Sequence, residues 1–71
     1  MVKFVEFKLT IQGKKELRLL NVKDISEISI ESKEGDCDQI WIRIENSYMH
    51  EDYNSYNEMM TRYNELKTLL E

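Results

Sequence analysis

The sequence predicts an α+β domain: a four-stranded antiparallel sheet, made of two hairpins joined by a short helical turn, with a C-terminal helix packed on one face. Isoleucine recurs at every second position from Ile40 to Ile44, which is the period of a strand with one apolar face. Near residue 56 the apolar period changes to three and four, as in an amphipathic helix. A chain of 71 residues without proline has room for one domain, residues 1–71.

The first hairpin is predicted from alternating apolar residues around a glycine. One face of a half-buried strand within residues 2–11 is formed by Val5, Phe7, Leu9 and Ile11. Residues 12–15 supply the turn, because Gly13 can take the positive φ that tight hairpins need. The second strand covers residues 16–20, and we expect Leu17 and Leu19 to face the core.

A capped turn and a second hairpin follow. Asn21 is a good N-cap, and Val22 and Ile25 are three apart, so we expect one helical or 3₁₀ turn. Residues 28–32 resume the alternation of a strand. An acidic loop over residues 33–38 joins this third strand to the isoleucine strand at 39–45.

The C-terminal helix is predicted to begin near 52–55 and to run to about 70. Its apolar stripe consists of Tyr56, Met59, Met60, Tyr63, Leu66 and Leu70. Ser55 with Glu58 fits a capping box, and Asp52 is an alternative cap one turn earlier. We expect Tyr56, Met60 and Tyr63 to shield Ile40, Ile42 and Ile44, which leaves Trp41 on the bare face of the sheet.

Part of the N-terminal half resembles a known family. The run Lys8-Leu9-Thr10, the pair Gly13-Lys14 and the segment Leu20-Asn21-x-x-x-Ile25-x-x-Ile28 are similar to the start of the short FlbD-like bacterial proteins. The resemblance covers roughly the first 30 residues; the second hairpin is longer and more acidic here, and the terminal helix is larger. It implies a hairpin-rich fold with a terminal helix and an accessory role, for instance flagellar, with no site residues.

The charge is divided unevenly along the chain. The net charge is −4, yet residues 1–23 hold six cations against two acids, and residues 24–52 hold nine acids against two cations. An acidic total disfavours direct nucleic-acid binding, which depends on Lys and Arg. Cys37 is the only cysteine, which favours a reducing compartment, and we expect a cytoplasmic protein. No apolar run is long enough for a membrane span.

Catalytic equipment is not recognisable in the sequence, so we expect a protein that is not an enzyme, with no cofactor, metal or small-molecule substrate. His50 is the only histidine and lacks companions with metal-ligand spacing. Glu34, Asp36 and Asp38 alternate like calcium ligands, but the required glycine and distal glutamate are out of register. Cys37 has no neighbouring cation to activate its thiol.

The leading hypothesis is a module that binds another protein, or a second copy of itself, through the bare sheet face or the polar and aromatic segment 46–64. The expected binding residues on the bare face are Trp41, Arg43, Arg18 and Glu31, together with Lys8, Thr10 and Ser29. In the segment 46–64 they are Tyr48 and Tyr53. A Trp beside an Arg is common at interface hot spots. Alternatively, Trp41 simply packs over the stem of Arg43, Lys8 or Arg18.

A second hypothesis is an acidic inhibitor of phage or mobile-element origin that blocks a nucleic-acid-binding enzyme by presenting carboxylates. Its surface would consist of Glu27, Glu31, Glu34, Asp36, Asp38, Glu51 and Asp52. This hypothesis requires these acids to form one contiguous surface. An immunity-type or accessory flagellar role is a third alternative, which rests on the resemblance to the FlbD-like proteins alone.

Overall fold

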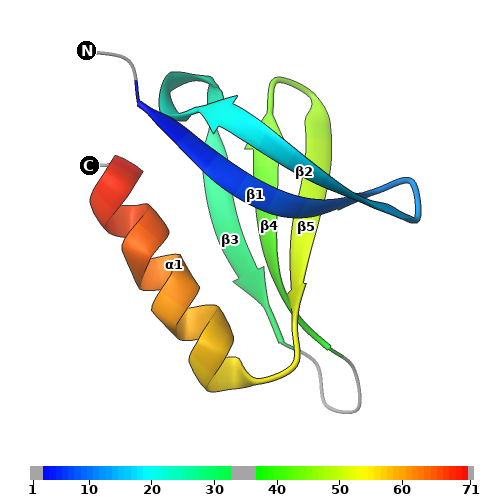
Figure 1. Ribbon diagram of the computed structural model, residues 1–71. Coiled ribbons are helices and arrows are strands. Elements are labelled where there is room, and N and C mark those ends of the chain that lie inside the picture. Colours follow the sequence, from blue (N-terminus) through cyan, green and yellow to red (C-terminus); the bar gives the residue numbers. More distant parts are fainter. Residues whose placement is uncertain (1–2, 33–36, 71) are drawn as a thin grey trace.

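The structure is a computed structural model that describes residues 3–32 and 37–70. Along these residues the elements are β1 (Phe4–Ile11), β2 (Lys14–Asn21), the 3₁₀ turn η1 (Val22–Asp24), β3 (Glu27–Glu31), β4 (Asp38–Ile44), β5 (Ser47–Tyr53) and the helix α1 (Tyr56–Leu70). The strands form one antiparallel sheet in the order β2-β1-β5-β4-β3. In Figure 1 the β1–β2 hairpin runs obliquely across the other strands, and α1 lies beside the sheet.

The α+β class and the terminal helix are confirmed, but the predicted four strands are wrong, because β5 is a fifth. Residues 47–53, in the first part of the segment 46–64 that the sequence suggests for recognition, form a central strand of the sheet. A two-residue turn at Glu45 and Asn46 leads into β5, and Glu45 has a positive φ of 56°. Glu51 is a charged residue at a buried position of this strand. The sequence of β5 therefore lacks the usual alternation of apolar and polar residues by which a strand is predicted.

The hydrophobic core lies between α1 and one face of the sheet, which we call the inner face; the opposite face is the outer face. The core side chains are Val5, Phe7, Leu9, Ile40, Ile42, Met49, Met59 and Leu66. The prediction that Ile40 and Ile42 face the core is therefore confirmed. Ile44 is partly buried and packs against the same cluster.

The helix begins after Ser55, whose Oγ accepts a hydrogen bond of 3.1 Å from the backbone N–H of Glu58. This confirms Ser55 as the cap; Asp52, the alternative, lies within β5. Met60 and Tyr63 pack on the core as expected. Tyr56 does not, since 52% of it is exposed: it is the first helical residue, and α1 reaches the core one turn later.

The two predicted leucines of β2 face away from the core. The β1–β2 turn has only two residues, Gln12 and Gly13, with φ of 51° and 80°, as in the tight turns that match strand twist. This register places Leu17 opposite Lys8 and Leu19 opposite Glu6, on the outer face. Leu17 is 70% exposed and Leu19 is 63% exposed, so the prediction that they are buried is wrong.

The connection between the hairpins is the predicted capped turn. Asn21 Oδ1 accepts a hydrogen bond of 3.0 Å from the backbone N–H of Lys23, which caps η1. Val22 and Ile25 both pack against the core at this turn. The turn lets the chain leave β2 at one edge of the sheet and enter β3 at the other.

A buried carboxylate joins the two halves of the sheet. β1 and β5 are paired only at Thr10 and His50. Beyond that pair, Glu51, which is 6% exposed, accepts hydrogen bonds from the backbone N–H of Lys8 at 2.9 Å and from Tyr53 Oη at 2.7 Å. Arg62 of α1 places Nε 3.4 Å from the same carboxylate and donates 2.7 Å to the carbonyl of Glu6. These side chains replace the missing ladder hydrogen bonds.

Candidate interaction surface on the outer face

The outer face carries two groups of side chains. The first is a polar and aromatic cluster over the middle of the sheet, consisting of Thr10, Gln39, Trp41, His50 and Asp52. The second, which we call the apolar patch, lies on the β1–β2 hairpin and consists of Phe4, Leu17 and Leu19. The pairing of the strands determines which side chains belong to each group, because directly opposed residues on neighbouring strands lie on the same face.

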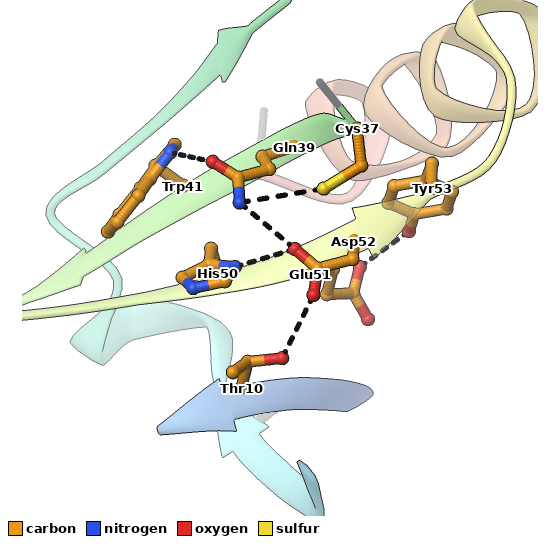
Figure 2. Close-up of polar contacts among 8 residues, drawn as sticks. All are labelled: Thr10, Cys37, Gln39, Trp41, His50, Glu51, Asp52 and Tyr53. Atoms are coloured by element: carbon orange, nitrogen blue, oxygen red, sulfur yellow. Dashed lines mark hydrogen bonds and ion pairs between the residues drawn. The ribbon is translucent and has the colours of Figure 1, made fainter. Parts of the chain in front are cut away.

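Asp52 is the centre of the polar cluster (Figure 2). Its Oδ1 accepts a hydrogen bond from Gln39 Nε2 at 3.1 Å and lies 2.8 Å from His50 Nδ1. Its Oδ2 accepts from Thr10 Oγ1 at 3.2 Å. The three partners come from β4, β5 and β1, so this carboxylate ties the central strands together on the outer face.

The environment of Asp52 favours its ionised form. Burial acts to raise the pKa of Asp52, but hydrogen bonds from Gln39, His50 and Thr10, together with the charge of His50, lower it below the ordinary value of 3.8. The carboxylate is therefore charged at neutral pH with its acceptor capacity largely used. A group held in this way stabilises the sheet and is a poor proton acceptor for catalysis.

Trp41 is fixed in place by the same cluster. Its Nε1 donates a hydrogen bond of 3.1 Å to Gln39 Oε1, and its ring lies over the His50 ring, with centroids 4.6 Å apart and planes at 42°. Of the two interpretations of Trp41, cross-strand packing is present, although its partner is His50 instead of Arg43, Lys8 or Arg18. The indole is half-buried and offers a partner only part of its surface.

The apolar patch is the more exposed part of the outer face. Phe4 is 56% exposed, and the two leucines beside it are exposed still further. Exposed apolar side chains scattered singly are ordinary, but three gathered on one face of one hairpin make that face a candidate contact surface. The sequence contains the signal that predicts this placement. A two-residue turn at Gln12-Gly13 fixes the β1–β2 register, and this register places Leu17 on the outer face.

The predicted binding residues are divided between the faces. Trp41, Arg43, Glu31 and Tyr48 are on the outer face, where Tyr48 is opposite Arg43 and 59% exposed. Arg18 is opposite Phe7 on the inner face, so the expectation that it shares the face of Trp41 is wrong. Tyr53, expected to bind as part of the segment 46–64, is opposite Asp38 on the inner face. The two-residue turn gives the β1–β2 hairpin a register that places Arg18 on the inner face. Tyr53 belongs to β5, the strand that the sequence does not predict.

Arg43 has an unusual environment. It is half-buried between Glu27 on β3 and Tyr48 on β5. Its Nε is buried and has no hydrogen-bond partner among the described residues. A buried donor without an acceptor is costly, so this atom lowers the stability of the fold at this part of the sheet.

The predicted acidic surface is also divided. Glu27, Glu31 and Asp52 are on the outer face, and Asp52 is engaged with three side chains. Asp38 is opposite Tyr53 on the inner face, and Glu51 is buried on the same face. Glu34 and Asp36 lie outside the described residues. The acids whose positions are described do not form one contiguous surface.

Within residues 3–32 and 37–70, no group of three or more His, Cys, Asp or Glu side chains could hold a metal ion. An open pocket of about 250 Å³ between β1 and β5 is lined by charges of both signs, including Lys8, Lys15 and Asp52. No helix of the described chain is long and apolar enough to cross a membrane.

Comparison with protein-family models, curated proteins and solved structures finds no significant match to this chain. The resemblance of the N-terminal residues to the FlbD-like proteins therefore stays a prediction. The outer face is the only basis for a functional proposal.

Proposed function

We propose that this chain is a non-enzymatic module that binds another protein through the outer face of its sheet. The observation that carries the proposal is the apolar patch of Phe4, Leu17 and Leu19. Burying such side chains in an interface removes apolar area from water, at roughly 25 cal/mol per Å². The fold does not need these side chains in its core, so their exposure is best explained by a second molecule.

The surroundings of the apolar patch suggest the chemistry of the partner. Lys8 is opposite Leu17, and Lys15 precedes it by two residues on the same face. Glu6, opposite Leu19, adds a single acid. A partner with an apolar centre and a mainly acidic rim would match this arrangement, as in interfaces with an apolar core and a polar rim.

The polar cluster would extend the binding surface across the sheet. Trp41 and Tyr48 are large amphipathic side chains of a kind enriched at interfaces, and Arg43 lies opposite Tyr48. Because Trp41 is already fixed by Gln39 and His50, it would bind without losing much side-chain freedom. We assign this cluster a secondary role, since it is less exposed than the leucines.

The acidic-inhibitor alternative gains no support from the arrangement of the acids. It needs carboxylates spaced along one surface, and the described acids lie on opposite faces, one of them buried. We therefore propose the outer-face module alone. The lone Cys37 remains the basis for proposing that it works in a reducing cytoplasm.

The proposal is tested by capturing proteins from an extract of the cells that encode the chain and quantifying them by mass spectrometry. The variant Leu17→Thr/Leu19→Thr keeps a good strand propensity and removes the leucines of the apolar patch. We expect it to lose the captured partner. Tyr56→Ser, which removes an aromatic that is 52% exposed on the helix, should retain it.

The same capture separates the two parts of the outer face. Trp41→Ala should reduce the captured amount less than the leucine variant, because the indole is half-buried. A partner retained equally by the leucine variant, Trp41→Ala and the unchanged chain would contradict the proposal.

A further inference from the structure

The alternation of hydrogen bonds between β1 and β2 shows which backbone groups of β2 point away from the sheet. The backbone N–H of Val22 donates to the carbonyl of Lys3 at 2.9 Å, and these two residues continue the β1–β2 register. Hydrogen-bonded pairs alternate along an antiparallel ladder, so Arg18 and Glu16 point their backbone groups at β1. Lys15, Leu17 and Leu19 consequently point theirs away from the sheet.

This edge is suited to pairing with another strand. β2 has eight residues, lies at the end of the sheet and contains no proline. Long edge strands with unpaired backbone groups are templates for further strands unless something covers them. Here Leu17 and Leu19 have two exposed parts. Their backbone groups point away from the sheet at this edge, and their side chains, with that of Phe4, form the apolar patch on the outer face.

We propose that β2 pairs edge to edge with β2 of a second copy of this chain, antiparallel, with Leu17 of each copy opposite the other. The inference rests on the proposed function and adds a second copy at the edge of β2, which leaves the outer surface of the apolar patch open to the acidic-rimmed protein proposed above. The resulting dimer has a twofold axis at the Leu17 pair, and its two sheets form one continuous sheet.

Charge complementarity selects this register. With Leu17 opposite Leu17, Glu16 of each copy lies opposite Arg18 of the other, which gives two attractive pairs. Within one chain these two side chains already form an exposed ion pair of 3.5 Å. A shift by one step places Arg18 opposite Arg18 or Glu16 opposite Glu16, and like charges in direct opposition are destabilising.

The other edge of the sheet does not offer the same match. Self-pairing of β3 with full overlap would be centred on Ser29 and would place Glu27 opposite Glu31 of the second copy. In the β2 pairing, the four leucines at positions 17 and 19 come together on the outer face, because diagonal neighbours on adjacent strands are in contact. Apolar burial and charge therefore favour the same edge, and charge selects the register.

The test measures the dimer dissociation constant by sedimentation equilibrium from low micromolar to submillimolar concentration. Glu16→Arg and Arg18→Glu each turn two attractive pairs into two repulsive ones, and each should raise the dissociation constant by about tenfold or more. The double variant Glu16→Arg/Arg18→Glu restores opposite charges and should return to within about threefold of the unchanged chain. Glu45→Arg, in the β4–β5 turn, makes the same charge change as Glu16→Arg and should have no effect.

Hydrogen exchange gives a second readout that needs no variant. The amides of Lys15, Leu17 and Leu19 should exchange more slowly as concentration rises, while those of β3 should not change. A monomer at every concentration would overturn the inference, as would a dimer whose dissociation constant the double variant fails to restore. A monomer would leave the proposed function standing if the leucine variant still loses its captured partner.

Discussion

The carboxylate of Glu51 occupies a position on β5 where a core side chain would ordinarily stand. Its partners are the backbone N–H of Lys8, the hydroxyl of Tyr53 and the guanidinium of Arg62, so each buried polar group there has a counterpart. Burial, followed by the hydrogen bond and charge of Glu51, raises the pKa of Tyr53 well above its ordinary value. Tyr53 therefore remains a hydrogen-bond donor throughout the physiological range. The function of Glu51 is structural.

Replacing Glu51 by Ala should lower the free energy of unfolding by about 3 kcal/mol, because it leaves buried donors without an acceptor. Urea denaturation measures this loss. Glu65→Ala is the matched control: it removes the exposed partner of the same arginine, 3.6 Å away, and should cost less than about 1 kcal/mol. Equal losses for the two variants would show that Glu51 does not join the sheet halves.

Asp52 should contribute to stability in a pH-dependent way. Its pKa is lower in the folded chain than its ordinary value of 3.8, so the stabilisation is fully present above about pH 4 and is lost as the pH falls through the folded pKa. Asp52→Asn should therefore be less stable than the unchanged chain at neutral pH. The difference should shrink in urea denaturation below about pH 4, and a difference that stays constant down to about pH 3 would contradict this role.

At the scale of the elements, β2 has two faces with different roles. Its inner face carries Leu20, which packs on the core, and its outer face carries Leu17 and Leu19. The sheet thus has apolar side chains on both faces of this hairpin. Since the inner face and α1 already form a closed core, the outer leucines contribute little to folding.

The variant Leu17→Thr/Leu19→Thr should therefore change the free energy of unfolding by less than about 1 kcal/mol. Ile42→Ala, which empties a fully buried position of β4, should cost about 3 kcal/mol. Both are measured by urea denaturation at low protein concentration, so that association does not contribute. A leucine variant as destabilised as Ile42→Ala would mean that these side chains belong to the core.

The sequence predicts well those elements whose residue pattern has a single physical cause, such as the burial of one face or a local capping hydrogen bond. The isoleucines of β4 alternate because one face is buried, and Asn21 and Ser55 cap short turns through local hydrogen bonds. β5 was missed because Glu51 fills one of its buried positions and relies on Arg62, a residue distant in the sequence. The outer leucines were misplaced because strand alternation does not say which face is buried; the turn register decides that.

At the scale of the whole molecule, charge and apolar exposure coincide at one end of the sheet. The basic N-terminal third forms the β1–β2 hairpin, which carries the apolar patch, and the acidic middle third forms β3, β4 and β5. The hairpin crosses the other strands obliquely and presents its outer face away from the core (Figure 1). This arrangement separates the folding surface from the proposed binding surface in a small domain.

The most direct test of that separation is oxidative labelling of side chains in the cell compared with the dilute purified chain. Phe4, Leu17 and Leu19 should be labelled strongly in the purified chain and protected in the cell, where a partner covers them. Tyr56, 52% exposed on the helix, serves as the internal reference and should be labelled equally in both. Equal labelling of all four residues in both samples would contradict the claim that the outer face is a binding surface.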